Sequence, residues 1–235
     1  MAIENLITTQ PRTPLIAASI LSADFARMGA EARAALEAGA DLLHLDVMDG
    51  HFVGNLTMGP DMCRGLSRSL PGALLDVHLM VRTPAAYVEP FAAAGAGHLT
   101  FHIEAAPEPA SLAGEIRAAG MTAGLAINPS TDVTRIMPFV QHVDLVLVMS
   151  VEPGFAGQEF MVSVLETVGR IKPVLGVGQR LQIDGGINAE TAQAARDAGC
   201  DCLVAASAIF GAAEYAPAIA ALRGGHVPQG DVEWP

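Results

Sequence analysis

The sequence predicts an α/β protein built as a single (β/α)8 barrel, in which a closed ring of parallel strands is surrounded by helices. Short β-type runs alternate with Ala-rich helical segments along the chain, and strands that alternate with helices pair in parallel through right-handed crossovers. Eight such runs fit within the 235 residues, a usual length for this barrel. Hydrophobic residues make up 51% of the chain and charged residues 16%, which suits strands buried on both faces.

A recurring Ala-Gly pair marks where helices end and strands begin. It occurs at Ala38-Gly39, Ala94-Gly95, Ala119-Gly120 and Ala198-Gly199, each shortly before a β-type run. Glycine suits this position because it adopts the left-handed conformation that closes a helix. We therefore expect strands at 15–20, 41–47, 73–79, 98–103, 121–127, 143–149, 180–183 and 202–205, and helices that include 25–38, 84–94 and 189–198.

The whole chain, 1–235, is predicted to be one barrel domain with a core at about 15–223. The ends, 1–13 and 224–235, are expected to be flexible or to pack as arms. An open doubly wound sheet is the structural alternative. It is disfavoured because no G-x-G-x-x-G follows the first predicted strand.

Charge and cysteine usage narrow the possible partners and the compartment. The chain has 25 acidic and 13 basic residues, a net charge of −12, so nucleic acid and anionic membrane surfaces repel it. No apolar run approaches the roughly 20 residues needed to cross a bilayer. The N-terminal sequence lacks a signal-peptide pattern, and three scattered cysteines fit a reducing compartment. We expect a cytoplasmic protein with neither a nucleic-acid nor a membrane partner.

Two histidines and two aspartates are predicted to meet at the mouth of the barrel, where active sites of this fold lie. His44 and Asp46 fall in the second strand, on one face because side chains alternate. His78 falls in the third strand and Asp184 ends the seventh. A single strand histidine is more often a hydrogen-bonded core residue than a ligand. Inward carboxylates, however, are too costly to bury unless they are paired or bind a metal. The set suits one divalent ion, Zn²⁺ first and otherwise Fe²⁺, Mn²⁺ or Co²⁺.

The last three strands end in turns that present backbone N–H groups to an anion. These turns contain Gly154, Phe155, Ala156 and Gly157, then Gly185 and Gly186, then Ala206 and Ser207 at the start of a short helix at 206–210. Phosphate groups bind at such positions in barrels. The alternative is that the glycines only make tight turns. Three strand ends also carry a methionine that either fills the core or shields the site from water: Met48, Met80 and Met149.

Five segments together resemble the ribulose-phosphate 3-epimerase family. They are Ser-Ile-Leu-Ser-Ala-Asp-Phe at 19–25, His-Leu-Asp-Val-Met-Asp-Gly-His-Phe at 44–52, Asp-Val-His-Leu-Met at 76–80, Met-Ser-Val-Glu-Pro-Gly-Phe-Ala-Gly-Gln at 149–158 and Ile-Asp-Gly-Gly-Ile-Asn at 183–188. The resemblance runs from about Leu15 to Gly211. It implies a (β/α)8 isomerase of the pentose phosphate pathway that interconverts D-ribulose 5-phosphate and D-xylulose 5-phosphate with one divalent metal. It also implies a homo-oligomer, dimeric or hexameric.

The resemblance assigns roles residue by residue. His44, Asp46, His78 and Asp184 correspond to metal ligands, and Asp46 and Asp184 also to the paired acid and base. Ser19 and His78 correspond to substrate-binding residues, as do the residues named above from the turns after the last three strands. The chemistry fits, because the C2 ketone acidifies the C3 proton. One carboxylate removes that proton, and the other returns one to the opposite face of a metal-stabilised enediolate.

Two departures and two alternatives stand beside this interpretation. Ala156 and Ala206 replace glycines that the family commonly has, and alanine resists a positive φ. The first alternative is a sister epimerase acting on D-allulose 6-phosphate, which shares the metal set and the Gly-Phe-Ala-Gly-Gln turn. The second is a non-catalytic barrel that binds a metal or a sugar phosphate. A Schiff-base aldolase is disfavoured because it needs a strand-end lysine, whereas the only lysine, Lys172, lies in a predicted helix.

Overall fold

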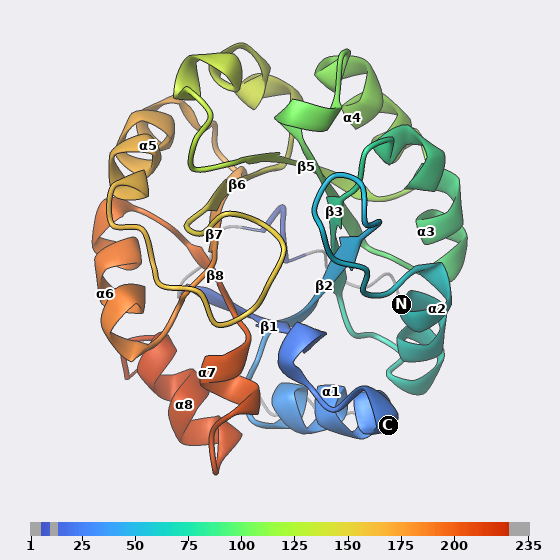
Figure 1. The fold of residues 1–235 in the computed structure, drawn as a ribbon, viewed down its shortest axis with the longest axis vertical. Coiled ribbons are helices and arrows are strands. Elements are labelled where there is room, and N and C mark those ends of the chain that lie inside the picture. The colour runs from blue at the N-terminus through green and yellow to red at the C-terminus, as the bar shows by residue number, and fades with distance from the viewer. Residues whose placement is uncertain (1–5, 10–13, 226–235) are drawn as a thin grey trace.

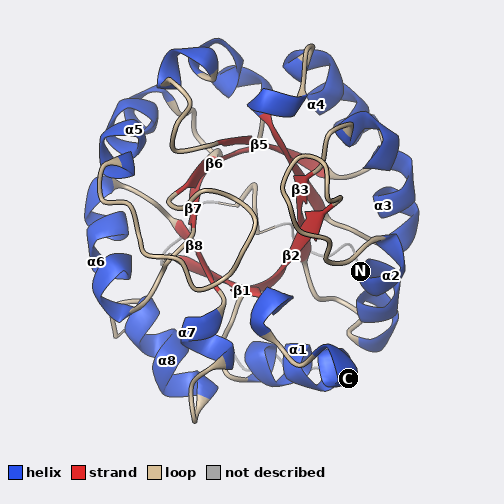
Figure 2. Ribbon diagram, viewed as in Figure 1, coloured by secondary structure: helices blue, strands red, loops and turns tan. Residues whose placement is uncertain are grey.

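The computed structural model describes residues 6–9 and 14–225, and it confirms the predicted closed barrel of eight parallel strands in chain order (Figures 1 and 2). All eight predicted strands overlap observed ones. The strands are β1 (Leu15–Ser19), β2 (Leu42–Met48), β3 (Leu75–Met80), β4 (His98–His102), β5 (Thr122–Ile127), β6 (Leu145–Met149), β7 (Arg180–Asp184) and β8 (Cys202–Ala205).

The helices form a ring around the strands (Figure 2). They are α1 (Met28–Glu37), α2 (Pro60–Ser69), α3 (Val88–Ala94), α4 (Pro109–Ala118), α5 (Val164–Ile171), α6 (Ala189–Ala198), α7 (Ser207–Phe210) and α8 (Tyr215–Leu222). The predicted helices at 25–38 and 84–94 each begin as a 3-10 turn, and β5 is joined to β6 by two 3-10 helices, Val133–Arg135 and Met137–His142. No helix in the described part of the chain is long and apolar enough to span a bilayer.

The predicted glycines close helices as expected. Gly95 ends α3 with φ 93° and Gly199 ends α6 with φ 113°. An alanine at either position would be strained, because a Cβ atom disfavours the left-handed conformation. The sequence signal therefore marks the points at which the chain turns from the outer ring back into the barrel.

Strand register determines which side chains share the barrel interior. In the β2–β3 pair, His44 lies opposite Asp76, Asp46 opposite His78, and Met48 opposite Met80. The alternate residues of β2 at 43, 45 and 47 belong to the apolar layer between strands and helices. Because alternate side chains point to opposite faces, this register brings the polar residues of β2 and β3 to the inside.

The N-terminal end of the barrel is closed by residues 6–9. Ile7 is fully buried in an interior cluster that includes Leu15 and Leu42. The buried guanidinium of Arg180 donates from Nε to the carbonyl of Leu6 at 2.7 Å and from Nη2 to the carbonyl of Thr9 at 2.7 Å. This segment therefore packs as an arm. Apart from residues 6–9 and 224–225, the ends predicted to be flexible, 1–13 and 224–235, lie outside the described residues.

We predict that Gly124→Ala destabilises the protein by about 1–3 kcal/mol, a typical penalty for overpacking. A Cβ atom at Gly124 of β5 would lie 2.2 Å from Oγ1 of Thr100 and 2.6 Å from Nε2 of His98, both buried in the barrel. The matched control is Gly114→Ala on the exposed side of α4, where a Cβ atom meets nothing within 4 Å. That control should gain up to about 1 kcal/mol from helix propensity. Urea unfolding measures both, and a Gly124→Ala protein as stable as wild type contradicts the prediction.

Candidate active site

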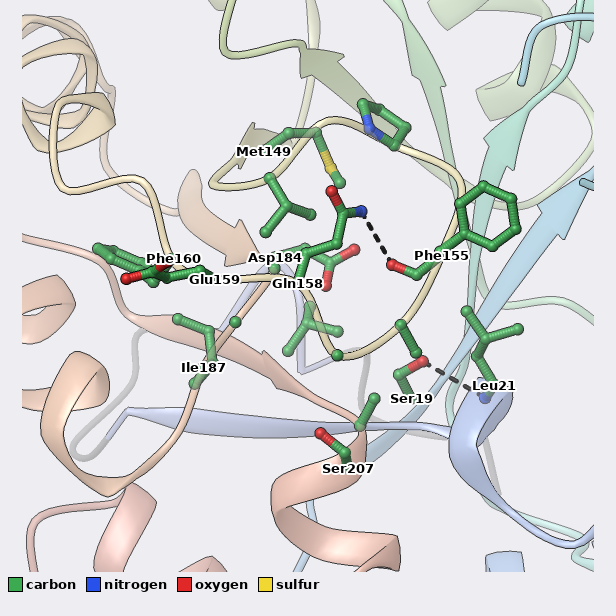
Figure 3. A pocket seen from close by; sticks show the side chains of 18 of the residues that line it. Ser19, Leu21, Met149, Phe155, Gln158, Glu159, Phe160, Asp184, Ile187 and Ser207 are labelled. Carbon is green, nitrogen blue, oxygen red and sulfur yellow. Dashed lines mark hydrogen bonds between the residues drawn. The ribbon is translucent and has the colours of Figure 1, made fainter. Parts of the chain in front are cut away.

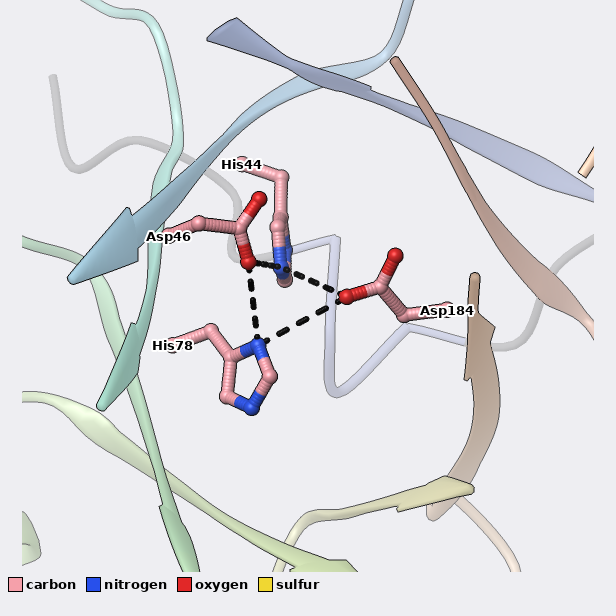
Figure 4. A group of neighbouring side chains, drawn as sticks. All are labelled: His44, Asp46, His78 and Asp184. Carbon is pink, nitrogen blue, oxygen red and sulfur yellow. Dashed lines mark hydrogen bonds and ion pairs between the residues drawn. The ribbon is translucent and has the colours of Figure 1, made fainter. Parts of the chain in front are cut away.

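Four side chains from three strands converge at the C-terminal end of the barrel (Figure 4). His44 and Asp46 come from β2, His78 from β3 and Asp184 from β7. Each offers one ligand atom, and these atoms all lie within 4.8 Å of one another. Oδ1 of Asp46 is 3.3 Å from Nε2 of His44 and 3.2 Å from Nδ1 of His78. Oδ2 of Asp184 is 3.7 Å and 3.6 Å from the same two nitrogens. The predicted cluster is therefore formed.

The cluster has the chemistry that a divalent cation requires. His44 and His78 are fully buried and Asp46 nearly so. Nε2 of His44 has no well-aligned hydrogen bond to any residue that the structure describes, although it faces two carboxylates. A buried polar atom without such a partner is unfavourable. Two imidazole nitrogens and two carboxylate oxygens are a suitable donor set for Zn²⁺ and for Fe²⁺, Mn²⁺ or Co²⁺. The residues present therefore fit a divalent ion.

Asp76 fixes the orientation of His44. Its Oδ2 lies 2.8 Å from Nδ1 of His44 and also accepts from Nε2 of Gln182 at 2.8 Å. A carboxylate only accepts hydrogen bonds, so Nδ1 of His44 carries a proton, and in the neutral ring that binds a cation the lone pair of Nε2 points into the cluster. Such carboxylate–histidine pairs are a common support of metal ligands. Asp76 is not among the residues predicted from the sequence to form the site. The signal for it is the pairing of β2 with β3, which places His44 opposite Asp76.

The surroundings of the cluster shift the pKa values of Asp46 and Asp184 in opposite directions. Burial opposes ionisation of Asp46, but His44 and His78 hold its pKa well below the usual range. Burial and the neighbouring charge of Asp46 instead raise the pKa of Asp184. Burial would lower the pKa of His44, yet Asp76 and Asp46 raise it well above its usual value. Without a cation, Asp46 is the stronger acid of the pair, and a bound dication favours ionisation of both carboxyls.

Ser19 supports Asp46 from the end of β1. Its hydroxyl donates to Oδ2 of Asp46 at 2.5 Å, and both groups are buried. Oδ1 of the same carboxylate faces the histidines. Thr57 fixes the strand itself, because its hydroxyl donates to the Asp46 carbonyl at 2.5 Å and accepts from the Met48 N–H at 3.0 Å. The Asp46 carboxylate is therefore held from both sides.

A cavity of about 580 Å³ opens above the cluster (Figure 3). Asp46 and Asp184 line it, whereas His44 and His78 lie buried beneath it. The methionines at the ends of β2, β3 and β6 are all buried and form part of its wall. It is also lined by the predicted substrate residues other than His78, namely Ser19, Gly154, Phe155, Ala156, Gly157, Gly185, Gly186, Ala206 and Ser207, and by the predicted shield, Met48, Met80 and Met149.

The turn after β7 can only be built with glycines. Gly185 and Gly186 have φ 121° and 62°. Cβ atoms there would lie 2.6 Å from Val151 and 2.7 Å from the Phe160 backbone nitrogen. Ser150 holds the same turn, because its hydroxyl lies 2.9 Å from the Asp184 carbonyl and 2.6 Å from that of Gly185. Ser150 thus ties the loop after β6 to the turn after β7, and this contact fixes the backbone of Asp184 at the end of β7. The sequence analysis gave Ser150 no such role.

Alanine at 206 does not have to adopt a positive φ. Ala206 has φ −107° and directly precedes α7, which begins at Ser207. No described non-glycine residue has a positive φ, so Ala156 likewise avoids the conformation that favours glycine. The two substitutions noted in the sequence are therefore compatible with the turns that line the cavity.

A histidine and a glutamate behind the cluster were missed by the sequence analysis. Nε2 of His102, at the end of β4, lies 2.8 Å from Nε2 of His78. Its Nδ1 lies 3.2 Å from Oε2 of Glu104. Burial lowers the pKa of His102 to about 4 despite the nearby carboxylate. Burial opposes ionisation of Glu104, but bonds from His102 and Thr131 lower its pKa to about 2. The signal available in the sequence is that His102 shares the inward face of its strand with His98.

The five motifs and this geometry agree with comparison to known proteins. The model of the ribulose-phosphate 3-epimerase family matches residues 15–210. The chain belongs to this family. A protein of Mycobacterium leprae named ribulose-phosphate 3-epimerase is 47% identical over 215 residues, covering 89% of this chain and 94% of that protein. A rice protein (Oryza sativa subsp. japonica) named ribulose-phosphate 3-epimerase, cytoplasmic isoform, is 47% identical over 215 residues, covering 88% and 92%.

A likeness to solved structures supports the fold alone. A chain of Mycobacterium tuberculosis tryptophan synthase aligns with a TM-score of 0.67 at 18% identity, covering 92% of this chain and 93% of that one. Membership of this family shows the class of enzyme to which the chain belongs. The prediction that the chain is an isomerase acting on carbohydrate, of the epimerase type, is confirmed by the family match and by the named relatives.

We predict that Zn²⁺ raises the melting temperature of chelator-treated protein, because an ion that binds only the folded state stabilises it. At a free concentration about 100 times Kd the gain is about 2.7 kcal/mol. His44→Gln should lose most of this shift, because a buried ligand is removed. His142→Gln, at an exposed histidine, should keep it. Scanning calorimetry with and without Zn²⁺ measures the three proteins. An unchanged wild-type transition, or an equal shift in His44→Gln, contradicts the metal assignment.

Proposed function

We propose that the chain interconverts D-ribulose 5-phosphate and D-xylulose 5-phosphate by moving the proton on C3. The observation that supports this most is the pair of carboxylates, Asp46 and Asp184, which line one cavity and share the contacts of His44 and His78. They come from β2 and β7, two strands separated in the ring by β8 and β1, and reach the cluster from opposite sides (Figure 4). Inversion at one carbon needs an acid and a base on opposite faces of that carbon.

One carboxylate acts as the general base and the other as the general acid. Asp46, whose pKa is held low by His44 and His78, removes the C3 proton from D-ribulose 5-phosphate. Asp184, whose pKa is raised by burial and by Asp46, starts this direction of the reaction protonated and delivers that proton to the other face of C3. In the reverse direction the roles exchange. Titratable pairs whose environments separate their pKa values commonly divide acid and base roles in this way.

The cluster would hold a divalent ion through His44, Asp46, His78 and Asp184. When bound, such an ion supplies positive charge that stabilises the negative charge on the substrate oxygens beside C3. We propose Zn²⁺ for it, with Fe²⁺, Mn²⁺ and Co²⁺ as other ions that the same ligands accept. Met48, Met80 and Met149 keep the reacting carbon away from water, which strengthens each electrostatic interaction at the site.

The phosphate is held by backbone rather than by charged side chains. The described residues that line the cavity include no lysine or arginine. We therefore propose that backbone N–H groups of the turns after β6, β7 and β8 donate to the phosphate. The main donors in this proposal are the N–H groups of Gly157, Gly186 and Ser207. Oriented backbone N–H groups in such turns form anion sites, and phosphate sites after the seventh and eighth strands are frequent in this fold.

Three wider properties follow as proposals. We place the enzyme in the cytoplasm, as the name of its rice relative says of that protein. Its three cysteines are free and buried, which agrees with a reducing compartment. We propose that it forms a homo-oligomer, and that its partner molecule is a small phosphorylated ketose. The family match favours the pentose phosphate over D-allulose 6-phosphate. The formed cluster favours a catalyst over a non-catalytic binding barrel.

Exchange of the C3 proton tests the proposed chemistry. Incubation with D-ribulose 5-phosphate in D₂O should put deuterium on C3, followed by NMR, and a chelator should stop it. Asp46→Asn and Asp184→Asn should each lower the exchange rate by about 10²–10⁴-fold or more, because each removes a general acid–base group. Asp61→Asn, at an aspartate with 96% of its side chain exposed, is the control.

The zinc content of each variant is also measured. A variant that keeps its zinc but loses exchange lacks only the proton-transfer group, whereas one that loses both lacks the ion. Exchange at the wild-type rate in Asp46→Asn refutes its role as the base. Exchange that a chelator leaves untouched refutes the role of the ion.

Competing substrates test the choice of sugar. The ratio kcat/KM should be higher for D-ribulose 5-phosphate than for D-allulose 6-phosphate, because the family match covers the pentose enzyme. A coupled assay for each product measures the ratio. A preference for the six-carbon substrate replaces the pentose assignment with the hexose one and leaves the proton-transfer scheme unchanged.

A further inference from the structure

The ring of His102 lies in a fully buried position between a candidate metal ligand and a carboxylate. Its Nε2 is 2.8 Å from Nε2 of His78, and its Nδ1 is 3.2 Å from Oε2 of Glu104. The ring also packs against those of His78, with ring centroids 5.0 Å apart, and Phe52, at 4.8 Å. His102 does not line the cavity. It therefore acts on the site only through His78.

Glu104 determines which nitrogen of His102 carries a proton. Its carboxylate is an acceptor only. Oε1 accepts the Asn128 backbone N–H at 3.0 Å, while Oε2 faces Nδ1 of His102. That ring nitrogen must therefore donate. A neutral imidazole has a single N–H, so Nε2 of His102 is left as an acceptor.

His102 in turn determines the tautomer of His78. Two ring nitrogens 2.8 Å apart share one hydrogen, and because Nε2 of His102 accepts, Nε2 of His78 donates. The lone pair of His78 is then on Nδ1. That atom is 3.2 Å from Oδ1 of Asp46 and 3.6 Å from Oδ2 of Asp184. In the ion-loaded protein its lone pair therefore faces the cation that the two carboxylates would also bind, whereas without an ion Nδ1 would carry a proton towards Asp46.

We propose that Glu104 and His102 are positioning residues that set the ion-binding tautomer of His78. Asp76 does the same for His44 in one step, because its carboxylate contacts Nδ1 directly. Glu104 acts in two steps, with His102 between carboxylate and ligand. The two histidines thereby present different nitrogens, Nε2 and Nδ1, to one point. The inference rests on the proposed role of His78 as an ion ligand.

Glu104→Gln is the decisive variant. The Asn128 N–H still requires an oxygen, so the side-chain amide turns its NH₂ group towards Nδ1 of His102. Nδ1 then accepts, the His102 proton moves to Nε2, and His78 is driven to carry its proton on Nδ1. Zn²⁺ affinity, measured by competition with a chromogenic chelator, should fall by about 10–100-fold, as is typical when an outer partner of a ligand is lost.

Two further variants serve as a negative and a positive control for the Zn²⁺ affinity of Glu104→Gln. Glu108→Gln makes the same change in charge at an exposed residue on the same connection, and it should bind Zn²⁺ as wild type does. Asp76→Asn replaces the carboxylate that supports His44 by a neutral, weaker acceptor and should weaken binding. If Asp76→Asn weakens binding while Glu104→Gln equals Glu108→Gln, the inference is overturned and the proposed site stands. If wild type fails to bind Zn²⁺, the proposed site itself is wrong.

A second measurement needs no variant and so does not depend on whether Glu104→Gln folds. ¹⁵N NMR of histidine side chains in the Zn²⁺-loaded wild-type protein should show the proton of His102 on Nδ1 and that of His78 on Nε2. A purely structural role of His102 sets no such pattern. A proton on Nε2 of His102 overturns the inference.

Discussion

The structure depends on one constraint, which is that carboxylates inside the barrel must be compensated. Asp46 and Asp76 are buried almost completely, and the side chain of Asp184 is only 15% exposed. The desolvation of an ionised carboxylate costs several kcal/mol even after relaxation. Hydrogen bonds from Ser19, Gln182 and the histidines offset part of that cost. We propose a divalent ion as the further compensation, because Nε2 of His44 has no well-aligned hydrogen bond to any residue that the structure describes.

The barrel makes this compensation possible because it fixes side chains by register. The β2–β3 pairing brings His44 beside Asp76 and Asp46 beside His78, so each acid has a base on the next strand. Further in, the interior holds an apolar cluster that includes the buried Ile7 at its base. The reactive groups therefore lie on rigid strands.

Periodicity in the sequence predicts the strands and the four residues of the cluster, because alternation along a strand is a local property. It cannot predict partners that tertiary packing supplies. Ser150 acts through carbonyls of β7, and His102 and Glu104 act through β3. Apart from the His102–Glu104 pair, these contacts join residues far apart in the sequence. The missing α-helix between β5 and β6 and the arm at 6–9 are likewise set by packing rather than by a local signal. The sequence also could not show whether Ala206 needs a positive φ, because the backbone angle of −107° is set by the folded turn.

Anomalous diffraction at the zinc absorption edge, from crystals of the Zn²⁺-loaded protein, tests the central claim most directly. The account predicts a single strong peak with Nε2 of His44, Nδ1 of His78 and one carboxylate oxygen each from Asp46 and Asp184 at about 2.0–2.2 Å. A peak elsewhere, or one that two or more of these atoms do not reach, contradicts it.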